Sequence, residues 1–136
     1  MPLIQWSDHY SVGVGDMDKH HQKLFDLLNR LHDAMIQGKA GNIITDIVDE
    51  LISYTKYHFG EEEKLMARIK YSGLNEHKKA HQKFIVSVAD YKNLANKGLT
   101  AFLSSGVSAF LSDWLRNHIG VMDKKYQKEM NANGIK

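Results

Sequence analysis

The chain has no cysteine, which excludes both a disulfide framework and a metal site built from thiolates. It has one proline and ten glycines in 136 residues, too few for a turn-rich fold, whereas apolar residues make up 43% and can form a packed core. No apolar run approaches the roughly 18 to 20 residues of a membrane span. The start, MPLIQW, lacks the basic and apolar regions of a signal peptide, so we expect a cytoplasmic protein.

An excess of charge of one sign is also lacking. The 18 basic residues alternate with 16 acidic ones, and the formal net charge is +2 with histidine neutral. A nucleic-acid-binding domain gathers its basic residues into a patch or stripe, so nucleic acid is not an expected partner. The length suits one domain, and no repeat or change of composition divides it. We therefore expect a single domain over residues 1–136.

Apolar residues recur at spacings of three and four in four segments, the pattern of amphipathic helices. We predict these helices from about Asp18 to Gln37, from a cap at Asn42 through Met66, from a cap at Asn75 to Gly98, and from near Thr100 to about Met130. Helices of roughly 20 residues joined by short links pack antiparallel. The sequence thus predicts an all-α, up-down-up-down four-helix bundle over about residues 17–130. Residues 1–16 have no helical period and are expected to form an extended arm against the bundle.

Seven titratable residues lie on the inward, apolar sides of the predicted helices. They are His21 on the first helix, His58 and Glu62 on the second, His77 and His81 on the third, and His118 and Asp123 on the fourth. Burying an unpaired imidazole or carboxylate is costly, so each needs a partner. The pairs on the second and third helices are four residues apart, which places both side chains on one face, within reach of one metal or of two adjacent metals. One such pair is weak evidence, but three pairs and a lone histidine predict a metal site.

The pair on the fourth helix departs from this spacing. His118 and Asp123 are five residues apart, which on a regular helix leaves them about 140° out of alignment. Either Asp123 approaches a metal from another side, or the helix widens locally to a turn with i to i+5 hydrogen bonds, which is rare but frequent at functional sites. Gly120 between them would ease such a distortion.

Other titratable residues nearby do not fit the inward pattern. His9 lies in the arm, His20 points about 100° away from its neighbour His21, and His32 flanks the apolar stripe. Glu61 and Glu63 adjoin Glu62 but turn away from it on a helix. We expect all five of these side chains to be solvated.

The order and spacing of the seven inward residues resemble the hemerythrin family, specifically the bacteriohemerythrins. The family pattern is a lone histidine, H-x-x-x-E, H-x-x-x-H and H-x-x-x-x-D in that order, and the resemblance runs from Trp6 to about Tyr126 without a departure. Either His20 or His21 satisfies the lone position. His21 stands three residues before Leu24 and four before Phe25, as the family's ligand stands before its Leu-Phe pair.

The resemblance implies a non-haem di-iron centre with two irons per chain and an oxo or hydroxo bridge. In it, His77, His81 and His118 bind one iron, His21 and His58 bind the other, and Glu62 and Asp123 bridge them. Two six-coordinate irons offer twelve positions, and these ligands with one bridging hydroxide fill eleven. One position stays open on the iron with two histidines, where a small ligand such as molecular oxygen can bind.

The implied function is reversible oxygen binding without enzymatic activity, for storage or for delivery to an oxygen-consuming enzyme. Two carboxylates are few beside the several glutamates of the di-iron carboxylate proteins, which favours carriage over oxygen activation. We expect an apolar lining that keeps water and protons from the bound oxygen. The residues expected to form it are Leu24, Leu28, Phe59, Trp114 and Ile119, although each alone is equally well explained as a core residue.

Rival interpretations use the same centre. A peroxide or nitric oxide reductase needs a proton donor beside the open position, and the sequence shows no spare titratable residue on the inward sides. An oxygen- or redox-sensing module is usually fused to a signalling domain, whereas this chain ends soon after its fourth helix. Iron storage is disfavoured, because a single closed site with seven ligands has no room for a mineral. Zinc is disfavoured, because a bridged set of seven ligands suits octahedral iron better. We expect a monomer, because one closed bundle can exist alone.

Overall fold

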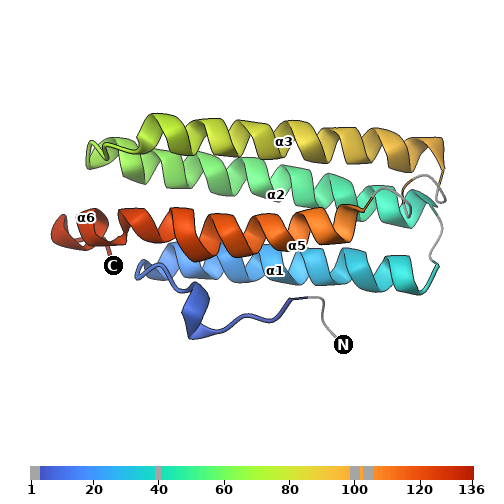
Figure 1. The fold of residues 1–136 in the computed structure, drawn as a ribbon, viewed down its shortest axis with the longest axis horizontal. Helices are drawn as coiled ribbons and strands as arrows, with labels where there is room; N and C mark the ends of the chain where they lie inside the picture. The colour runs from blue at the N-terminus through green and yellow to red at the C-terminus, as the bar shows by residue number, and fades with distance from the viewer. Residues whose placement is uncertain (1–3, 39–40, 99–101, 103–105) are drawn as a thin grey trace.

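A computed structural model describes residues 4–38, 41–98, 102 and 106–136 (Figure 1), and all regular structure within them is helical. The elements are η1 (Asp8–Tyr10), α1 (Gly15–Ile36), α2 (Gly41–Arg68), α3 (Leu74–Lys97), α5 (Val107–Asn117), the π-helix η2 (His118–Met122), the 3₁₀ helix η3 (Asp123–Tyr126) and α6 (Gln127–Ala132). The last four follow one another without a break and form a fourth helical run.

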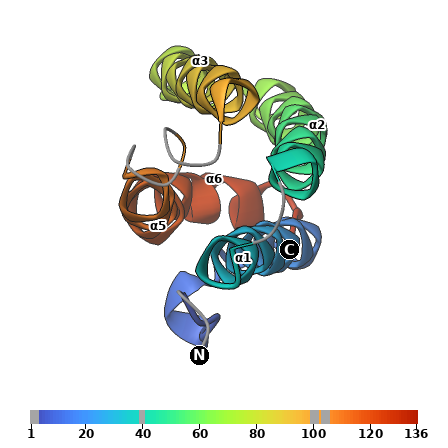
Figure 2. The same cartoon turned by 90° about the vertical axis from the view of Figure 1, so that its right-hand side faces the viewer.

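Successive runs alternate in direction and lie side by side (Figure 1). Viewed end-on, α1, α2, α3 and α5 surround a common axis (Figure 2). The predicted all-α, up-down-up-down four-helix bundle is confirmed. None of the described helices has both the length and the apolar character that crossing a membrane requires.

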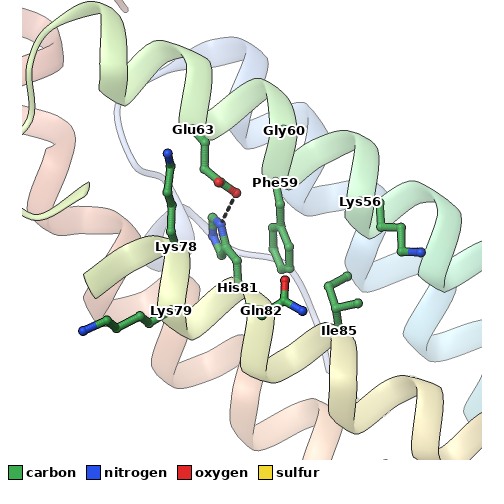
Figure 3. Close-up of a pocket in the computed structure, with 9 residues that line it drawn as sticks. All are labelled: Lys56, Phe59, Gly60, Glu63, Lys78, Lys79, His81, Gln82 and Ile85. Carbon is green, nitrogen blue, oxygen red and sulfur yellow. Dashed lines mark hydrogen bonds and ion pairs between the residues drawn. The ribbon is translucent and has the colours of Figure 1, made fainter. Parts of the chain in front are cut away.

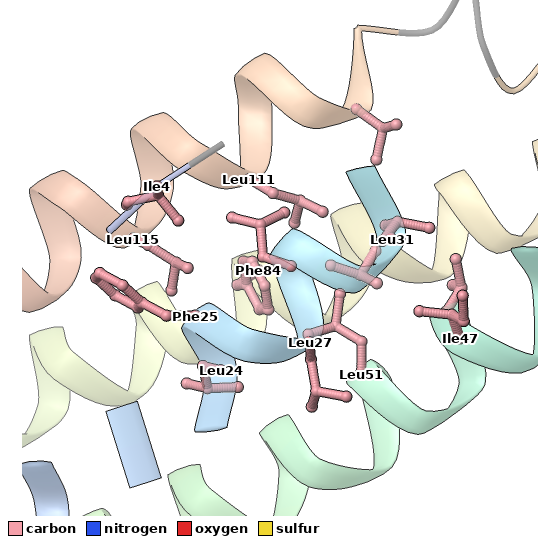
Figure 4. Close-up of a cluster of buried hydrophobic side chains, with 14 of the residues drawn as sticks. Ile4, Leu24, Phe25, Leu27, Leu31, Ile47, Leu51, Phe84, Leu111 and Leu115 are labelled. Carbon is pink, nitrogen blue, oxygen red and sulfur yellow. The ribbon is translucent and has the colours of Figure 1, made fainter. Parts of the chain in front are cut away.

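Apolar side chains from all four runs fill most of the interior (Figure 4). Leu24, Leu28 and Leu31 of α1 are at most 2% exposed, because their spacing of three and four residues keeps them on one helix face. They meet Leu51 of α2 and Leu111 of α5 in the same buried cluster. Full burial of each such side chain stabilises the fold by roughly 1.5–3 kcal/mol.

A second, smaller apolar cluster closes one end of the bundle. It contains Val12, Val14, Met17, Met66, Tyr126 and Met130, and so joins the arm to three helical runs. Met17 lies one turn before His21 on α1, and Met66 lies one turn after Glu62 on α2. The inward titratable residues therefore form a layer between two apolar clusters.

The N-terminal arm is extended, as predicted, except for the short 3₁₀ turn η1. Its Ile4 exchanges two hydrogen bonds with the Asn29 side chain, at 3.0 and 2.8 Å. Farther along, Asp18 accepts hydrogen bonds from the Ser11 hydroxyl at 2.6 Å and from the Val12 N–H at 2.8 Å. These contacts fix the arm along α1.

The sequence predicted the four helical runs correctly, but it predicted their first and last residues less accurately. The helix α1 begins at Gly15, three residues before the predicted start. The predicted cap at Asn75 is wrong: the His77 N–H bonds to the Gly73 carbonyl at 3.0 Å, so the helix α3 starts after Gly73. Gly98 ends α3, as predicted, with a φ of 144° that other residues rarely adopt. The predicted cap side chain of Asn42 and the start near Thr100 lie outside the described residues.

Candidate metal centre

All seven inward residues predicted from the sequence are buried in one layer of the bundle. They are His21, His58, Glu62, His77, His81, His118 and Asp123, and none is more than 5% exposed. Their potential ligand atoms form two groups, within each of which the atoms lie no more than 4.8 Å apart. One group contains His77, His81 and His118, the other contains His21 and His58, and both contain Glu62 and Asp123.

Glu62 directs one carboxylate oxygen toward each group. Its Oε2 lies 3.4 Å from Nε2 of His21 and 3.5 Å from Nε2 of His58. Its Oε1 lies 3.2 Å from Nε2 of His77 and 3.0 Å from Nε2 of His81. This carboxylate is thus placed to bridge two adjacent cations.

The two carboxylate oxygens of Asp123 are likewise directed toward different groups. Its Oδ2 lies 3.1 Å from Nε2 of His21, and its Oδ1 lies 2.7 Å from Nε2 of His77 and 2.9 Å from Nε2 of His118. The π-helix η2 makes this possible, because an i to i+5 turn brings residues five apart onto one face. The sequence left open how Asp123 could face inward, and the structure shows that the helix widens.

Several buried polar atoms of the centre have no hydrogen-bond partner among the described residues. They are both ring nitrogens of His21, Oε1 of Glu62 and Oδ2 of Asp123. Neighbouring imidazole nitrogens lie close to these oxygens but without hydrogen-bond geometry. Each unsatisfied buried group costs about 1–3 kcal/mol. Moreover, Nε2 of His81 faces Nε2 of His118 at 3.1 Å. Bound cations would satisfy Nε2 of His21, Oε1 of Glu62 and Oδ2 of Asp123 together, and a set of imidazoles and carboxylates fits a transition metal such as iron.

The electrostatics of the layer without metal also favour cations. Burial alone would lower the pKa of His21, but the nearby carboxylates of Asp123 and Glu62 raise it to about 9, and the same two carboxylates raise the pKa of His77 to about 9. Burial lowers the pKa of His58 to about 3. Burial opposes ionisation of the two carboxyls, yet the surrounding histidines hold the pKa of each well below its usual range. Two buried carboxylates therefore stay anionic and attract positive charge.

Three residues that sequence reasoning did not place at the centre contact it directly. The buried hydroxyl of Tyr126 donates to Oε2 of Glu62 at 2.8 Å. The Nδ1 atom of His20 lies 2.9 Å from Nδ1 of His58, and Oε2 of Glu63 lies 3.1 Å from Nδ1 of His81. These contacts correct three expectations, since His20 and Glu63 were expected to be solvated and no further titratable residue was expected to face inward.

The other polar neighbours are placed more nearly as expected. His9 is exposed, and Glu61 reaches outward to pair with Lys64 at 3.2 Å. His32 is half-buried instead of solvated, with Nδ1 3.2 Å from the Ser108 hydroxyl. Neither His9 nor His32 belongs to the two ligand groups.

The five residues predicted to line an oxygen pocket lie in different surroundings. Leu24 and Leu28 line a small internal apolar cavity, and Ile119 is buried. Phe59 instead stacks on the ring of His81, with centroids 3.7 Å apart, and Trp114 stacks on His118 at 4.2 Å. The rest of the cavity wall is formed by Leu51, Phe84, Leu111 and Leu115, which the sequence did not distinguish from other core residues.

The outer edges of His81 and His118 lie beside open surface clefts. One cleft, of about 460 Å³, lies between α2 and α3, with Phe59, Glu63 and His81 along it (Figure 3). A second, of about 390 Å³, is lined in part by Trp114 and His118. The layer is therefore shielded along the bundle axis by apolar clusters and approaches solvent at its sides.

The bundle and its buried histidine and carboxylate layer define a helical metal-binding protein. The family model described as the hemerythrin HHE cation binding domain matches residues 12–129. Bacteriohemerythrin from Methylococcus capsulatus is 34% identical over 133 residues, which are 97% of this chain and 100% of that protein. Myohemerythrin from Riftia pachyptila is 32% identical over 122 residues, covering 90% and 89%. A crystal structure of wild-type hemerythrin, 30% identical, matches with a TM-score of 0.80 over 93% of this chain and 96% of that one. The chain belongs to the hemerythrin family.

Proposed function

We propose that this chain binds molecular oxygen reversibly at a non-haem di-iron centre. The observation that carries the proposal is the sharing of Glu62 and Asp123 between two donor groups, with one oxygen of each carboxylate directed toward each group. Two adjacent cations bridged by two carboxylates use every one of these donors. A single cation would leave part of the buried set unsatisfied, at the cost given above.

In this proposal the two irons have unequal sets of histidines. His77, His81 and His118 hold one ion, His21 and His58 hold the other, and Glu62 and Asp123 bridge them. When bound, the iron pair supplies the electrons that oxygen binding requires and recovers them on release. The group with one imidazole fewer leaves room for a small ligand, so we place oxygen on that side.

The side chains around the centre favour reversible binding over oxygen reduction, which consumes protons. The small cavity lined by Leu24 and Leu28 lies one helical turn from His21, and apolar cavities of this kind stay dry. The hydroxyl of Tyr126 already donates a hydrogen bond to Glu62 and is therefore not free to protonate bound oxygen. Burial and the charges of Glu62 and Asp123 hold the pKa of Tyr126 well above its usual range, so its phenol keeps that proton.

The wider role that we propose is oxygen storage or delivery to an oxygen-consuming enzyme, by a monomer of one domain. The hydrogen bonds of Ile4 with Asn29 support one domain, because they join the arm to α1. Sensing and peroxide or nitric oxide reduction are the alternatives. Both would use the same metal centre, so the test has to separate binding from turnover.

The test is anaerobic reconstitution with ferrous iron, metal analysis, and absorption spectra over repeated cycles of oxygen and argon. We expect two irons per chain, uptake of about one oxygen per iron pair, and recovery of the oxygen-free spectrum in each cycle. His21→Ala should abolish the uptake, whereas His9→Ala, a change at an exposed histidine of the arm, should not. Irreversible oxygen consumption with turnover would identify an oxidase or reductase instead.

A further inference from the structure

The His81 ring is held on α3 by a carboxylate from the neighbouring helix (Figure 3). Its Nδ1 lies 3.1 Å from Oε2 of Glu63, on the side of the cleft. Its Nε2 points the opposite way, 3.0 Å from Oε1 of Glu62 and 3.1 Å from Nε2 of His118. A carboxylate accepts the hydrogen of an Nδ1–H group, which leaves the lone pair of Nε2 directed at the centre.

Phe59 holds the same ring from its face. The two rings are parallel within 3° and their centroids are 3.7 Å apart, so the plane of His81 is set by packing. Phe59 and Glu63 are four residues apart on α2 and therefore share one side of that helix. One helix thus fixes both the plane of the imidazole and the nitrogen that carries its hydrogen.

The other donor group has a different outer partner. Nδ1 of His58 lies 2.9 Å from Nδ1 of His20, an imidazole. The outer partner of His81, in the three-histidine group, is therefore a carboxylate, and that of His58, in the two-histidine group, is an imidazole. A carboxylate hydrogen-bonded to a ligand histidine makes that imidazole a stronger donor to the metal, and a second imidazole does so less.

We propose that Glu63 is a positioning residue of the centre, which holds His81 with Nε2 toward the metal and, through its negative charge, stabilises the oxidised state of the three-histidine iron. This inference rests on the proposed di-iron function. It assigns a role to a residue outside the seven ligands, and it distinguishes the two irons by their outer hydrogen bonds as well as by their number of histidines.

The position of Glu63 makes the proposal testable without damage to the core. Its side chain is 26% exposed and borders the open cleft, so a smaller side chain there leaves no buried void. Glu61, two residues earlier on α2, is 40% exposed and pairs with Lys64. Substitutions of Glu61 remove the same charge from the same turn without touching a ligand and serve as the matched control.

The experiment compares Glu63→Gln and Glu63→Ala with Glu61→Gln and Glu61→Ala, each reconstituted with ferrous iron. Iron affinity is measured anaerobically by competition with a chelator, and the reduction potential by redox titration. We expect Glu63→Ala to lower the affinity for one of the two irons by about 10–100-fold. Glu63→Gln keeps a hydrogen-bond acceptor and should lose less affinity. Both changes should raise the reduction potential, by about 59 mV for one electron if the affinity for ferric iron falls tenfold more than the affinity for ferrous iron.

The potential of the Glu63→Gln variant decides between positioning and simple packing, because glutamine has nearly the same size and lacks only the charge. Thermal unfolding of the metal-free variants is measured alongside, so that lost folding is not counted as lost affinity. The proposal is overturned if the Glu63 variants match the Glu61 variants in affinity and potential, or if the affinity loss is explained by unfolding. The iron content of the unsubstituted chain separates the two failures. If that chain does not hold two irons, the proposed function is rejected. If that chain holds two irons but the Glu63 variants behave like the Glu61 variants, only the role of Glu63 is rejected.

Discussion

The backbone N–H of Asp123 donates to the carbonyl of His118, five residues earlier, and Oδ1 of the same aspartate lies 2.9 Å from Nε2 of that histidine. One widened turn therefore aligns both side chains with the centre. The fourth helical run departs from regular α-helix where the two donors need a common face. After this turn the run passes through η3 into α6.

The first prediction concerns this aspartate. Asp123→Asn removes the charge and one of the two oxygens that face the donor groups, while keeping the size of the side chain. Loss of an outer partner alone typically lowers metal affinity by about 10–100-fold, so loss of a bridging ligand should cost at least as much. We expect fewer than two irons per chain after reconstitution, measured by metal analysis. The control is Asp113→Asn, an exposed aspartate on α5. Retention of two tightly bound irons would contradict the bridging role.

Six of the seven inward residues, all except Asp123, could be predicted because the periodicity of a regular helix is fixed. The pairs at i and i+4 need only that α2 and α3 be regular, and both are. Tyr126 was missed because it follows the irregular turn. Tyr126 is eight residues after His118, so on a regular helix its side chain would point about 80° away from that of His118. The widened turn alters this angle and directs Tyr126 toward the centre. Helical periodicity is therefore reliable up to His118 and fails beyond it.

His20 and Glu63 were missed for another reason. Each adjoins a residue of the donor groups in sequence, and a rotation of about 100° per residue directs it away from the bundle axis. The second nitrogen of an imidazole ligand also points away from the metal, so it meets these flanking residues at the side of the bundle. The spacing of ligands within one helix does not reveal which residue of a neighbouring helix contacts that nitrogen.

The second prediction concerns the hydroxyl of Tyr126. Tyr126→Phe keeps the buried ring in the smaller apolar cluster and removes only the 2.8 Å hydrogen bond to Glu62. A hydrogen bond to a charged group contributes about 1.5–3 kcal/mol, so the free energy of unfolding of the metal-free protein should fall by that amount. Chemical denaturation measures the change. Tyr91→Phe, at a half-buried phenol ten residues beyond His81, should change it far less. An equal loss in both variants would show that the Glu62 contact is not the cause.

The third prediction follows from the pKa values of the metal-free layer. The pKa of His21 and of His77 is raised from 6.5 to about 9 on folding, so their contribution to stability is complete below pH 6.5 and is lost as pH rises through 9. The pKa of His58 is lowered from 6.5 to about 3, so stability falls as the pH drops from 6.5 toward 3. Metal-free protein should therefore be most stable near pH 6.5.

Thermal unfolding across pH 4 to 10, with and without iron, measures this profile. With iron bound, the histidines are neutral ligands and lack the second ring proton that the metal-free imidazolium forms lose, so the decline between pH 6.5 and 9 should disappear. His9→Ala should leave the metal-free profile unchanged, because the residue is exposed and outside the layer. A metal-free profile that keeps rising from pH 6.5 to 9 would show that the two histidines are not protonated at neutral pH.

The last prediction tests the apolar surroundings of the proposed oxygen site. Ile119 directly follows His118 and is 1% exposed within the larger apolar cluster. Ile119→Glu places a carboxyl in that cluster, where it should admit water and protons and speed the oxidation that ends reversible oxygen binding. Val121→Glu adds the same group two residues later on η2, where the side chain is 57% exposed, and should leave the rate close to that of the unsubstituted protein. The half-life of the oxygenated spectrum at constant oxygen pressure gives the rate. Because both variants change the net charge equally, a faster decay confined to Ile119→Glu can be assigned to the loss of a dry lining, and equal decay in the two would exclude that explanation.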